Sequence, residues 1–347
     1  MNYDEYFTYK EIKEQPKVFS KILKNLNEIK DLAKELEETN TIILTGCGTS
    51  YYAGISIAYA LNMLTSKIAL AFPSSELIFY NFKAFKNSIL ITISRSGETT
   101  ETVKAAKKAK ENGWKVLAIT NNEKSTLYQI ADFKLLARAG AEKSIVMTKT
   151  FSSMLFNALL LAAYLAEYEG NDIAEEIIKD AEKIPKIAEK IFKYEDLLKE
   201  LASKHKKSRF VILGRGVNYG VALEAALKLR ETSYLSTNAF STLEFRHGPM
   251  ALVDNKLIAI GLAPKMPDYE EDLSLYEEIE KKGGHVFIIT NLKEEIGVKS
   301  LLKYDEISEF LTPVINIIPI QLLAFFIAVG KGYNPDKPRH LVKVVKI

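Results

Sequence analysis

A strand, a Gly-x-Gly turn and a helix follow one another twice in this chain, and this repeat limits the possible folds more than any other feature. The pattern occurs at 42–64 and returns at 210–230. A second marker, an apolar run that ends in Thr-Asn after a Gly-bearing turn, occurs at 118–121 and at 288–291. The interval between the two markers is nearly the same in both copies. Two markers at matched spacing indicate a duplicated unit.

Strands alternate with helices in both copies, which predicts an α/β fold. Such alternation forms parallel, doubly wound sheets that bind their ligands at the carboxyl ends of the strands. We therefore expect two parallel-sheet subdomains, each an αβα sandwich. The expected divisions are an N-terminal helical segment at 1–40, a first subdomain at 41–170, linking helices at 171–206, a second subdomain at 207–334 and a C-terminal tail at 335–347.

Two stretches outside the repeated pattern are expected to be helical. An apolar stripe predicts one helix from Val18 to about Glu38. From Thr148 to about Lys206 the pattern indicates two or three helices, with breaks near Gly170 and Pro185.

A cluster of hydroxyl side chains lies where a buried strand at 88–93 is followed by a predicted helix at 99–111. The connecting loop is Ser94-Arg95-Ser96-Gly97-Glu98-Thr99. Free N–H groups and the positive end of the helix dipole make a helix N-terminus a site for anions. Hydroxyl groups add donors, and Gly97 allows close approach of the backbone. We expect this loop to hold a phosphate; the alternative is that Ser96 or Thr99 only caps the helix.

The second copy lacks this hydroxyl loop. Its corresponding strand, 257–260, is followed by Ala263-Pro264, so phosphate binding should belong to the first copy. The Gly-x-Gly pairs are not dinucleotide fingerprints, because Tyr51 stands where a third glycine belongs and no acidic residue follows at the usual distance.

The composition narrows the class of protein. A net charge of +3 over 347 residues indicates neither a nucleic-acid surface nor a membrane surface. Cys47 is the only cysteine, so no intramolecular disulfide can form. No signal peptide is visible and the apolar runs have the length of core elements, which favours a soluble cytoplasmic protein. No metal-ligand cluster is visible, and we expect no metal and no cofactor.

Several motifs resemble those of the sugar isomerase (SIS) family. The likeness is closest to the isomerase domain of the glutamine–fructose-6-phosphate aminotransferases (glucosamine-6-phosphate synthases), and it extends from Glu11 to Lys343. It rests on Cys47-Gly48-Thr49-Ser50, Ser94-Arg95-Ser96-Gly97-Glu98-Thr99, Ala226-Leu227-Lys228-Leu229-Arg230-Glu231, Arg246-His247-Gly248-Pro249 and Lys337-Pro338-Arg339-x-Leu341-x-Lys343.

The resemblance implies two SIS subdomains, a sugar-phosphate substrate and a homodimer whose active site borrows residues across the interface. The residues implied to hold the phosphate are Ser50, Ser94, Arg95, Ser96 and Thr99. The residues implied to contact the sugar are Val146 and Thr148. The resemblance implies that Glu231 is the base that moves a proton between C1 and C2, and that His247 of the neighbouring subunit opens the sugar ring. It implies that Lys228 lies near O1 and that Lys343 forms a Schiff base with open-chain fructose 6-phosphate. Arg339 belongs to the same C-terminal loop as Lys343.

The chemistry of these residue types agrees with such a role. Aldose–ketose interconversion needs one carboxylate that takes a proton from one carbon and returns it to the next. Glu231 and Lys228 share one face of a predicted helix at 219–235; the alternative is an exposed ion pair worth only ~0.3–0.5 kcal/mol. His247 has the alternative of a structural role in a turn. Lys343 is flanked by valines, which suggests a docked tail and a desolvated amine of lowered pKa that can form an imine.

Two departures from the synthase pattern bear on the reaction. The synthase carries an N-terminal glutaminase domain, whereas this sequence starts Met1-Asn2-Tyr3 and has Cys47 inside the first copy. We therefore expect no glutamine-derived ammonia, and we favour interconversion of glucosamine 6-phosphate and fructose 6-phosphate with free ammonia, in the deaminating direction. Arg95 stands where the synthase usually has Gln, and it adds a charged grip for the phosphate or for another substrate group.

Three alternatives stay open at this point. The first is an aldose–ketose isomerase of another hexose phosphate without amino transfer. The second is a non-catalytic sugar-phosphate sensor, although the regulators that contain SIS domains carry a DNA-binding domain for which the first forty residues are too few. The third is a subunit that completes a separate glutaminase partner.

Overall fold

The computed structural model describes residues 2–80, 84–85, 87–297 and 300–345, and it divides into two compact units. The first unit comprises Glu14–Glu142, Met147–Glu182 and Val342–Ile347. The second unit comprises Met1–Lys13, Lys143–Val146 and Lys183–Leu341. Each unit is built around its own five-stranded sheet.

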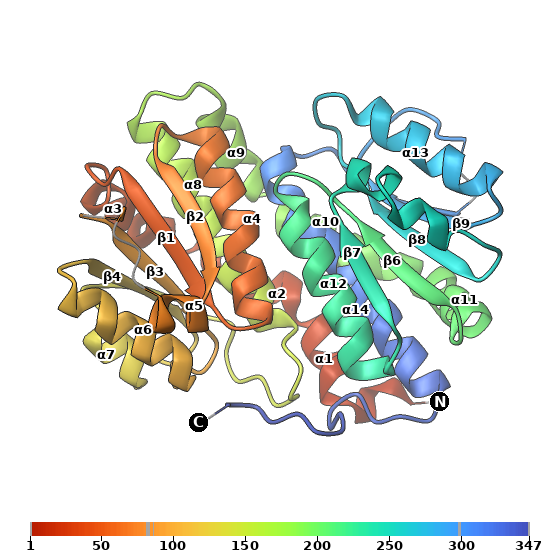
Figure 1. Ribbon diagram of the computed structural model, residues 1–347, viewed down its shortest axis with the longest axis horizontal. Helices are drawn as coiled ribbons and strands as arrows, with labels where there is room; N and C mark the ends of the chain where they lie inside the picture. Colours follow the sequence, from red (N-terminus) through yellow and green to blue (C-terminus); the bar gives the residue numbers. More distant parts are fainter. Residues whose placement is uncertain (1, 81–83, 86, 298–299, 346–347) are drawn as a thin grey trace. The chain divides into compact units, whose positions relative to one another are not determined.

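The first unit contains a parallel sheet in the order β2-β1-β3-β4-β5 (Figure 1). Its strands are β1 (Thr41–Gly46), β2 (Ile68–Pro73), β3 (Ile89–Ser94), β4 (Lys115–Thr120) and β5 (Phe133–Leu136). Its helices are α2 (Gln15–Leu23), α3 (Leu26–Glu35), α4 (Thr49–Leu64), α5 (Ser74–Phe79), α6 (Thr100–Glu111), α7 (Thr126–Ile130), α8 (Lys149–Tyr168) and α9 (Ile173–Ala181).

Helices cover both faces of this sheet. On one face α6 and α7 pack against side chains that include Ile43, Leu90 and Val116, and α4 and α8 cover the other face (Figure 1). All six residues of β3 are buried, as expected for a central parallel strand covered on both faces.

The second unit repeats this arrangement. Its strands are β6 (Arg209–Leu213), β7 (Thr237–Phe240), β8 (Leu257–Leu262), β9 (His285–Thr290) and β10 (Ser300–Lys303). They form a parallel sheet in the order β10-β9-β8-β6-β7, which is the order of the first sheet when β6 is matched with β1. Its helices are η1 (Tyr3–Glu5), α1 (Phe7–Lys13), α10 (Ile184–Ile191), η2 (Phe192–Tyr194), α11 (Glu195–His205), α12 (Asn218–Ser233), η3 (Thr242–Arg246), η4 (Pro249–Leu252), α13 (Tyr269–Lys281), η5 (Glu309–Leu311) and α14 (Thr312–Gly330).

The predicted α/β fold of two doubly wound parallel sheets is therefore confirmed, and so is the duplication. The single helix predicted from Val18 to Glu38 is wrong, because Asn25 precedes a new helix and divides the stretch into α2 and α3. The break expected near Pro185 is present, since α9 ends at Ala181 and α10 begins at Ile184. Pro185 lies in the first turn of α10, where its missing N–H costs no helical hydrogen bond.

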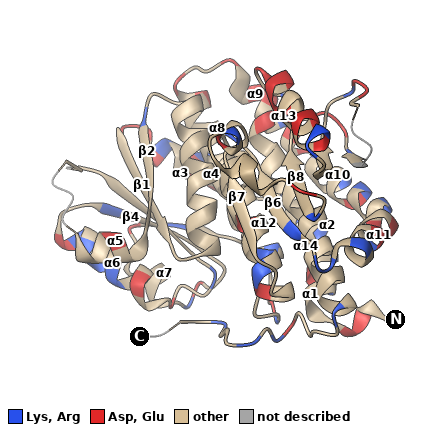
Figure 2. Cartoon of the chain, turned by 45° about the vertical axis from the view of Figure 1, so that its right-hand side comes forward, with Lys and Arg blue, Asp and Glu red and all other residues tan. Residues whose placement is uncertain are grey.

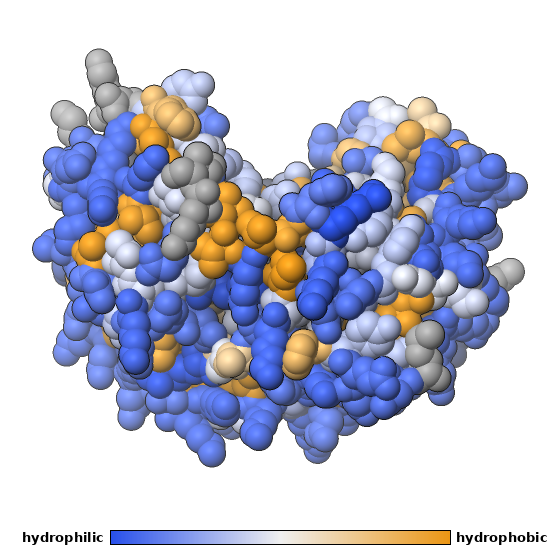
Figure 3. Space-filling model, turned by 90° about the horizontal axis from the view of Figure 1, so that it is seen from below, coloured by the Kyte–Doolittle hydropathy of each residue, from blue (hydrophilic) through white to orange (hydrophobic). Residues whose placement is uncertain are grey.

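Two helices are longer and more apolar than expected from the sequence. Lys149–Tyr168 and Glu309–Gly330 are long and apolar enough to cross a membrane by length and composition. Their apolar windows are 94% and 100% buried within the protein, so they are core helices of the two units. Charged side chains instead gather on covering helices such as α6, α11 and α13 (Figure 2). The face in Figure 3 is mostly hydrophilic, with separate apolar patches.

Candidate active site

The hydroxyl loop lies at the point of the first sheet where the strand order reverses. β1 and β3 are hydrogen-bonded neighbours although β2 lies between them in sequence. The loop after β1 leads to Ser50 in the first turn of α4. β3 ends at Ser94, and the loop after it contains Ser96 and Thr99. Ligands of doubly wound sheets bind at this position, because the two loops diverge there and open a crevice.

The loop after β3 is shaped by its own hydroxyl groups. Ser94 Oγ accepts a hydrogen bond from the Gly97 N–H at 3.1 Å, and Ser96 Oγ accepts one from the Glu98 N–H at 3.1 Å. Because each oxygen acts as an acceptor in these bonds, each hydroxyl hydrogen can be donated in another direction. An anion that sits over the loop would receive such donors.

Helix capping does not explain the hydroxyl groups. Thr99 is the N-cap residue of α6, but its side chain makes no capping hydrogen bond. The hydroxyl of Ser96 accepts from Glu98, which precedes the helix. The alternative that these residues only cap α6 therefore does not describe their contacts.

Position 97 requires glycine for two reasons, its backbone conformation and the lack of room for a side chain. Its φ is +65°, and a Cβ built on it would come within 2.5 Å of the Ser125 side chain.

We expect Gly97→Ala to lower the free energy of unfolding by roughly 2–5 kcal/mol, because it combines a left-handed backbone with a steric clash. Gly113→Ala is the matched control, since its φ is +78° and nothing lies within 4 Å of its Cβ position, and it should cost only about 1–2 kcal/mol. Equal losses in urea unfolding would contradict the steric part of this account.

Arg95 and Lys343 come together in the first unit, with Glu142 between them. Arg95 Nη1 donates to Glu142 Oε2 at 3.0 Å, and Arg95 Nη2 donates to the carbonyl oxygen of Lys343 at 3.0 Å. Lys343 Nζ donates to the carbonyl oxygen of Glu142. The structure thus ties the tail lysine predicted to form the imine to the loop predicted to bind phosphate.

Two of the three valines around Lys343 are exposed and only Val344 is partly buried, so the apolar docking expected from the sequence is at most slight. Val342 and Val345 are 65% and 47% exposed. The tail is instead held by polar contacts, which include a 3.4 Å hydrogen bond from the Thr100 N–H to the Val345 carbonyl. The contacts of Lys343 with Arg95 and Glu142 were not predicted from the sequence, and its role in forming an imine stays a prediction.

Glu142 is a buried acid that the sequence interpretation missed. Its Oε1 accepts from the N–H and the hydroxyl of Thr148 at 2.9 and 3.1 Å, and its carboxylate also accepts from the N–H and the hydroxyl of Thr150. Thr148, predicted to contact the sugar, is therefore bonded to Glu142 at the start of α8. A single acid in an irregular loop has no sequence spacing that could have identified it.

The second unit holds the predicted acid–base residues. Lys228 Nζ lies 3.1 Å from Glu224 Oε1 and 2.5 Å from Glu231 Oε2, all on α12. The Lys228 side chain is 2% exposed, Glu224 is fully buried, and Glu231 is 19% exposed. Burial disfavours the charge on Lys228, but the two carboxylates outweigh it and raise the lysine pKa. The pair is thus not an exposed surface ion pair, and Glu231 is the acid of this trio that solvent or a ligand can reach.

The other predicted residues of the second unit differ in exposure. His247 is exposed, and its backbone N–H donates to the Glu244 carbonyl at 3.0 Å. Val146 has a buried side chain and a carbonyl that accepts from the Ser144 hydroxyl at 2.9 Å. The Arg339 guanidinium lies 4.1 Å from the centre of the Tyr234 ring. Because Glu231 and His247 belong to one unit and the hydroxyl loop to the other, the structure places these two groups of predicted residues in different units.

The corresponding crevice of the second sheet is filled by the protein itself. Arg215, after β6, donates from Nε to Asp272 at 2.9 Å and from Nη2 to the carbonyls of Pro267 and Asp268. Burial is the main cause that raises the pKa of Asp272 to about 6, although Arg215 opposes it. An ion pair between Arg215 and the buried Asp272 thus lies beside the segment that corresponds to the hydroxyl loop of the first unit; that phosphate binds only in the first unit stays a prediction.

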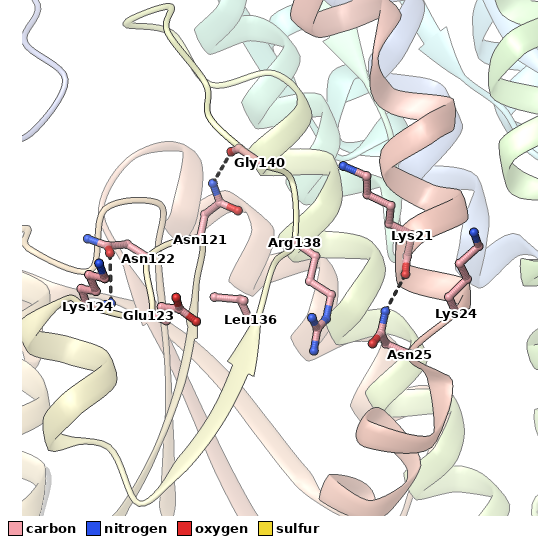
Figure 4. A pocket seen from close by; sticks show the side chains of 10 residues that line it. All are labelled: Lys21, Lys24, Asn25, Asn121, Asn122, Glu123, Lys124, Leu136, Arg138 and Gly140. Atoms are coloured by element: carbon pink, nitrogen blue, oxygen red, sulfur yellow. Dashed lines mark hydrogen bonds between the residues drawn. The ribbon is translucent and has the colours of Figure 1, made fainter.

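A separate pocket of about 550 Å³ in the first unit contains none of the predicted site residues (Figure 4). Its lining includes the basic residues Lys21, Lys24 and Arg138. Asn122 also lines it and donates from its side chain to the Ser96 carbonyl at 3.2 Å, so part of the pocket wall supports the hydroxyl loop.

Comparisons with known proteins agree with this architecture. The chain is 37% identical over 350 residues to a glutamine–fructose-6-phosphate aminotransferase [isomerizing] of Pyrococcus horikoshii, which covers 99% of this chain and 58% of that protein. The corresponding protein of Thermococcus kodakarensis is 35% identical with the same coverage. The chain thus spans little more than half the length of the curated relatives it matches.

Two solved structures match nearly end to end. The C-terminal domain of a glucosamine-fructose-6-phosphate aminotransferase from Francisella tularensis superposes with a TM-score of 0.87 at 26% identity, over 96% of this chain and 98% of that one. A glucosamine-6-phosphate deaminase from Thermotoga maritima superposes with a TM-score of 0.81 at 30% identity, over 98% and 99% of the two chains. The SIS domain model matches residues 35–164 and 204–329, two regions that contain all ten strands of the two sheets. The chain therefore belongs to the SIS domain family.

Proposed function

We propose that this protein is a phosphosugar isomerase that interconverts glucosamine 6-phosphate and fructose 6-phosphate. The observation that carries the proposal is the placement of Lys343 in the first unit, tied through Arg95 and Glu142 to the hydroxyl loop. An amine held beside an anion site suits a substrate that carries a phosphate at one end and a carbonyl carbon at the other.

The phosphate end of the substrate is assigned to Ser50, Ser94, Ser96 and Thr99. Hydroxyl and backbone N–H donors at a helix N-terminus stabilise a phosphate through both hydrogen bonds and the helix dipole. The family resemblance adds Val146 and Thr148 for the sugar, with Val146 acting through its backbone because its side chain is buried.

The proton transfers are assigned to the second unit. His247 of the partner subunit opens the sugar ring, which requires the proposed homodimer and an exposed imidazole. In the open-chain aldehyde Glu231 removes the proton from C2 and returns it to C1, while one amino proton is lost and O1 gains a proton, so that C1 becomes an alcohol and the amino carbon a ketimine. Lys228 stays protonated beside Glu231 and stabilises negative charge that develops near O1.

The amino group leaves through Lys343. Its neutral amine adds to the ketimine carbon, ammonia departs, and water hydrolyses the lysine imine to fructose 6-phosphate. We propose the deaminating direction with free ammonia, because the end-to-end match to the Thermotoga maritima structure is to a glucosamine-6-phosphate deaminase. A cytoplasmic location suits this chemistry, since its small phosphorylated substrates occur there.

A second candidate is an aldose–ketose isomerase of another hexose phosphate. The chain also superposes on a tagatose-6-phosphate ketose/aldose isomerase from Escherichia coli with a TM-score of 0.82 at 26% identity. Glu231 and His247 would serve both reactions, whereas only the first needs the amine of Lys343.

Thr99→Val tests the phosphate assignment. The substitution removes one hydroxyl that makes no capping hydrogen bond, so the loop should keep its structure. A lost hydrogen bond to a charged group corresponds to about 1.5–3 kcal/mol, or roughly tenfold or more in affinity for glucosamine 6-phosphate. Calorimetric titration with inorganic phosphate should show the same loss, while thermal stability stays unchanged. Unaltered phosphate affinity would remove Thr99 from the site.

A further inference from the structure

We propose that Arg95 is a positioning residue that clamps the C-terminal tail and thereby holds Lys343 beside the hydroxyl loop, instead of gripping the phosphate. The role of Lys343 in this inference rests on the proposed function. The clamp itself rests on the contacts of three residues, Arg95, Glu142 and Lys343.

The guanidinium of Arg95 spans two partners with separate nitrogens. Nη1 bonds the Glu142 carboxylate and Nη2 bonds the Lys343 carbonyl, each at 3.0 Å. The side chains of Arg95 and Glu142 are 10% and 1% exposed. A planar guanidinium fixed at both ends of its fork has little freedom to turn toward a third group.

The backbone of Arg95 is fixed as well. Its carbonyl oxygen accepts hydrogen bonds from the Asn121 N–H at 3.2 Å and from the Thr120 hydroxyl at 3.3 Å. The side chain therefore leaves the loop from a rigid point between Ser94 and Ser96. The residues of the loop thus have two different roles. The serines and Thr99 offer hydroxyl groups to an anion, and Arg95 contacts the tail.

Glu142 contacts both Arg95 and the side-chain amino group of Lys343. Its carboxylate receives Arg95, and its carbonyl oxygen receives the ammonium of Lys343. The tail lysine is thus held at its backbone by Arg95 and at its amino group by Glu142. Because Val342 and Val345 are exposed and only Val344 is partly buried, these polar contacts hold the tail more than apolar docking does.

Moving Arg95 onto a phosphate would have a cost. The Glu142 carboxylate would lose this cation while buried, and the tail would lose a backbone contact. Removing one partner of a buried ion pair is strongly destabilising, because the other charge is left buried without compensation. A neutral and shorter Gln at position 95 cannot bridge both partners. The positive charge at this position therefore serves to hold Glu142 and the tail.

Arg95→Gln distinguishes a tail clamp from a phosphate ligand. We expect amide hydrogen exchange of residues 341–345 to accelerate about tenfold or more, since lost local structure lowers protection. The affinity for inorganic phosphate should stay within about threefold, because the hydroxyl donors are intact. Unchanged exchange in the tail overturns the proposal, whatever happens to phosphate binding.

Two further variants keep the test decisive. Arg138→Gln is the matched control, because it breaks the Arg138–Glu28 ion pair in the same unit and should leave tail exchange unaltered. Deletion of 342–347 removes the part of the tail that contacts Arg95 and leaves Arg95 itself in the chain. If Arg95→Gln still weakens phosphate binding about tenfold in this shortened protein, Arg95 contacts the phosphate and the proposal is wrong.

The readouts also separate this inference from the proposed function. Borohydride trapping of fructose 6-phosphate on Lys343 should fall about tenfold in Arg95→Gln at saturating sugar. Wild-type protein that shows no trapping would refute the proposed imine, while faster tail exchange in Arg95→Gln would still establish the clamp.

Discussion

Replacing Glu231 by Gln is expected to slow C1–C2 proton exchange by about 10²–10⁴-fold, the range that a general base contributes. The physical reason is that Gln keeps the size and the hydrogen-bonding capacity of the side chain but cannot accept the substrate proton. Of the two carboxylates that form ion pairs with Lys228 on α12, Glu231 is 19% exposed whereas Glu224 is fully buried. Deuterium incorporation at C1 and C2 in D2O, followed by proton NMR, measures the loss.

Glu224→Gln is the informative comparison for this variant. Both acids contact Lys228, but Glu224 is fully buried. Both replacements take a counter-charge from the buried lysine, but that of Glu224 should lower the midpoint of thermal unfolding more than Glu231→Gln, because solvent can reach position 231 and not position 224. Full exchange activity in Glu231→Gln would dismiss this residue as the base.

Lys343→Arg is expected to abolish borohydride trapping of fructose 6-phosphate and to lower deamination on the order of a hundredfold or more. Arginine keeps the positive charge and can still donate to the Glu142 carbonyl, but a guanidinium does not form an imine with a sugar carbonyl. Peptide mass analysis after reduction locates the adduct.

Lys337→Met serves as the control for this prediction, since Lys337 belongs to the same C-terminal segment but not to the proposed site. It should keep trapping and turnover at the level of the unmodified protein. An adduct on another lysine, or full turnover in Lys343→Arg, would remove the imine role from Lys343.

Much of the fold could be predicted because its signals are local or repeated. β1 and β6 are followed by the same Gly-x-Gly turn, and the shared strand order of the two sheets agrees with the duplication read from those turns. β3 and β8 are fully buried, and uninterrupted apolar runs identify such strands. The four-residue strands β7 and β10 escaped prediction, because short strands at sheet edges have neither a long apolar run nor a distinctive turn.

The site was less accessible to prediction because its contacts join distant parts of the chain. Arg95 meets Glu142 across 47 residues and Lys343 across 248. No periodicity connects such positions. The hydroxyl loop could be predicted from its place between a strand and a helix, but the partner of Arg95 became visible only in three dimensions. The predicted assignment of Arg95 to the phosphate thus stays a prediction, and the clamp is the competing assignment.

The buried trio on α12 illustrates the same limit. The spacing of Lys228 and Glu231 placed both on one face, but spacing alone equally suited an exposed ion pair. Burial distinguishes an enclosed ion pair from an exposed one. The buried Lys228 needs both neighbouring carboxylates to stay charged, whereas an exposed lysine keeps its charge without an acidic partner.

The most direct measurement for the proposed function is the release of ammonia from glucosamine 6-phosphate by the purified protein. We expect ammonia and fructose 6-phosphate to form in equal amounts without added glutamine, and the activity to disappear in Glu231→Gln. Conversion of another hexose phosphate with no ammonia from glucosamine 6-phosphate would support the simple aldose–ketose isomerase instead. If neither ammonia nor fructose 6-phosphate forms, the proposed deaminating isomerase is contradicted.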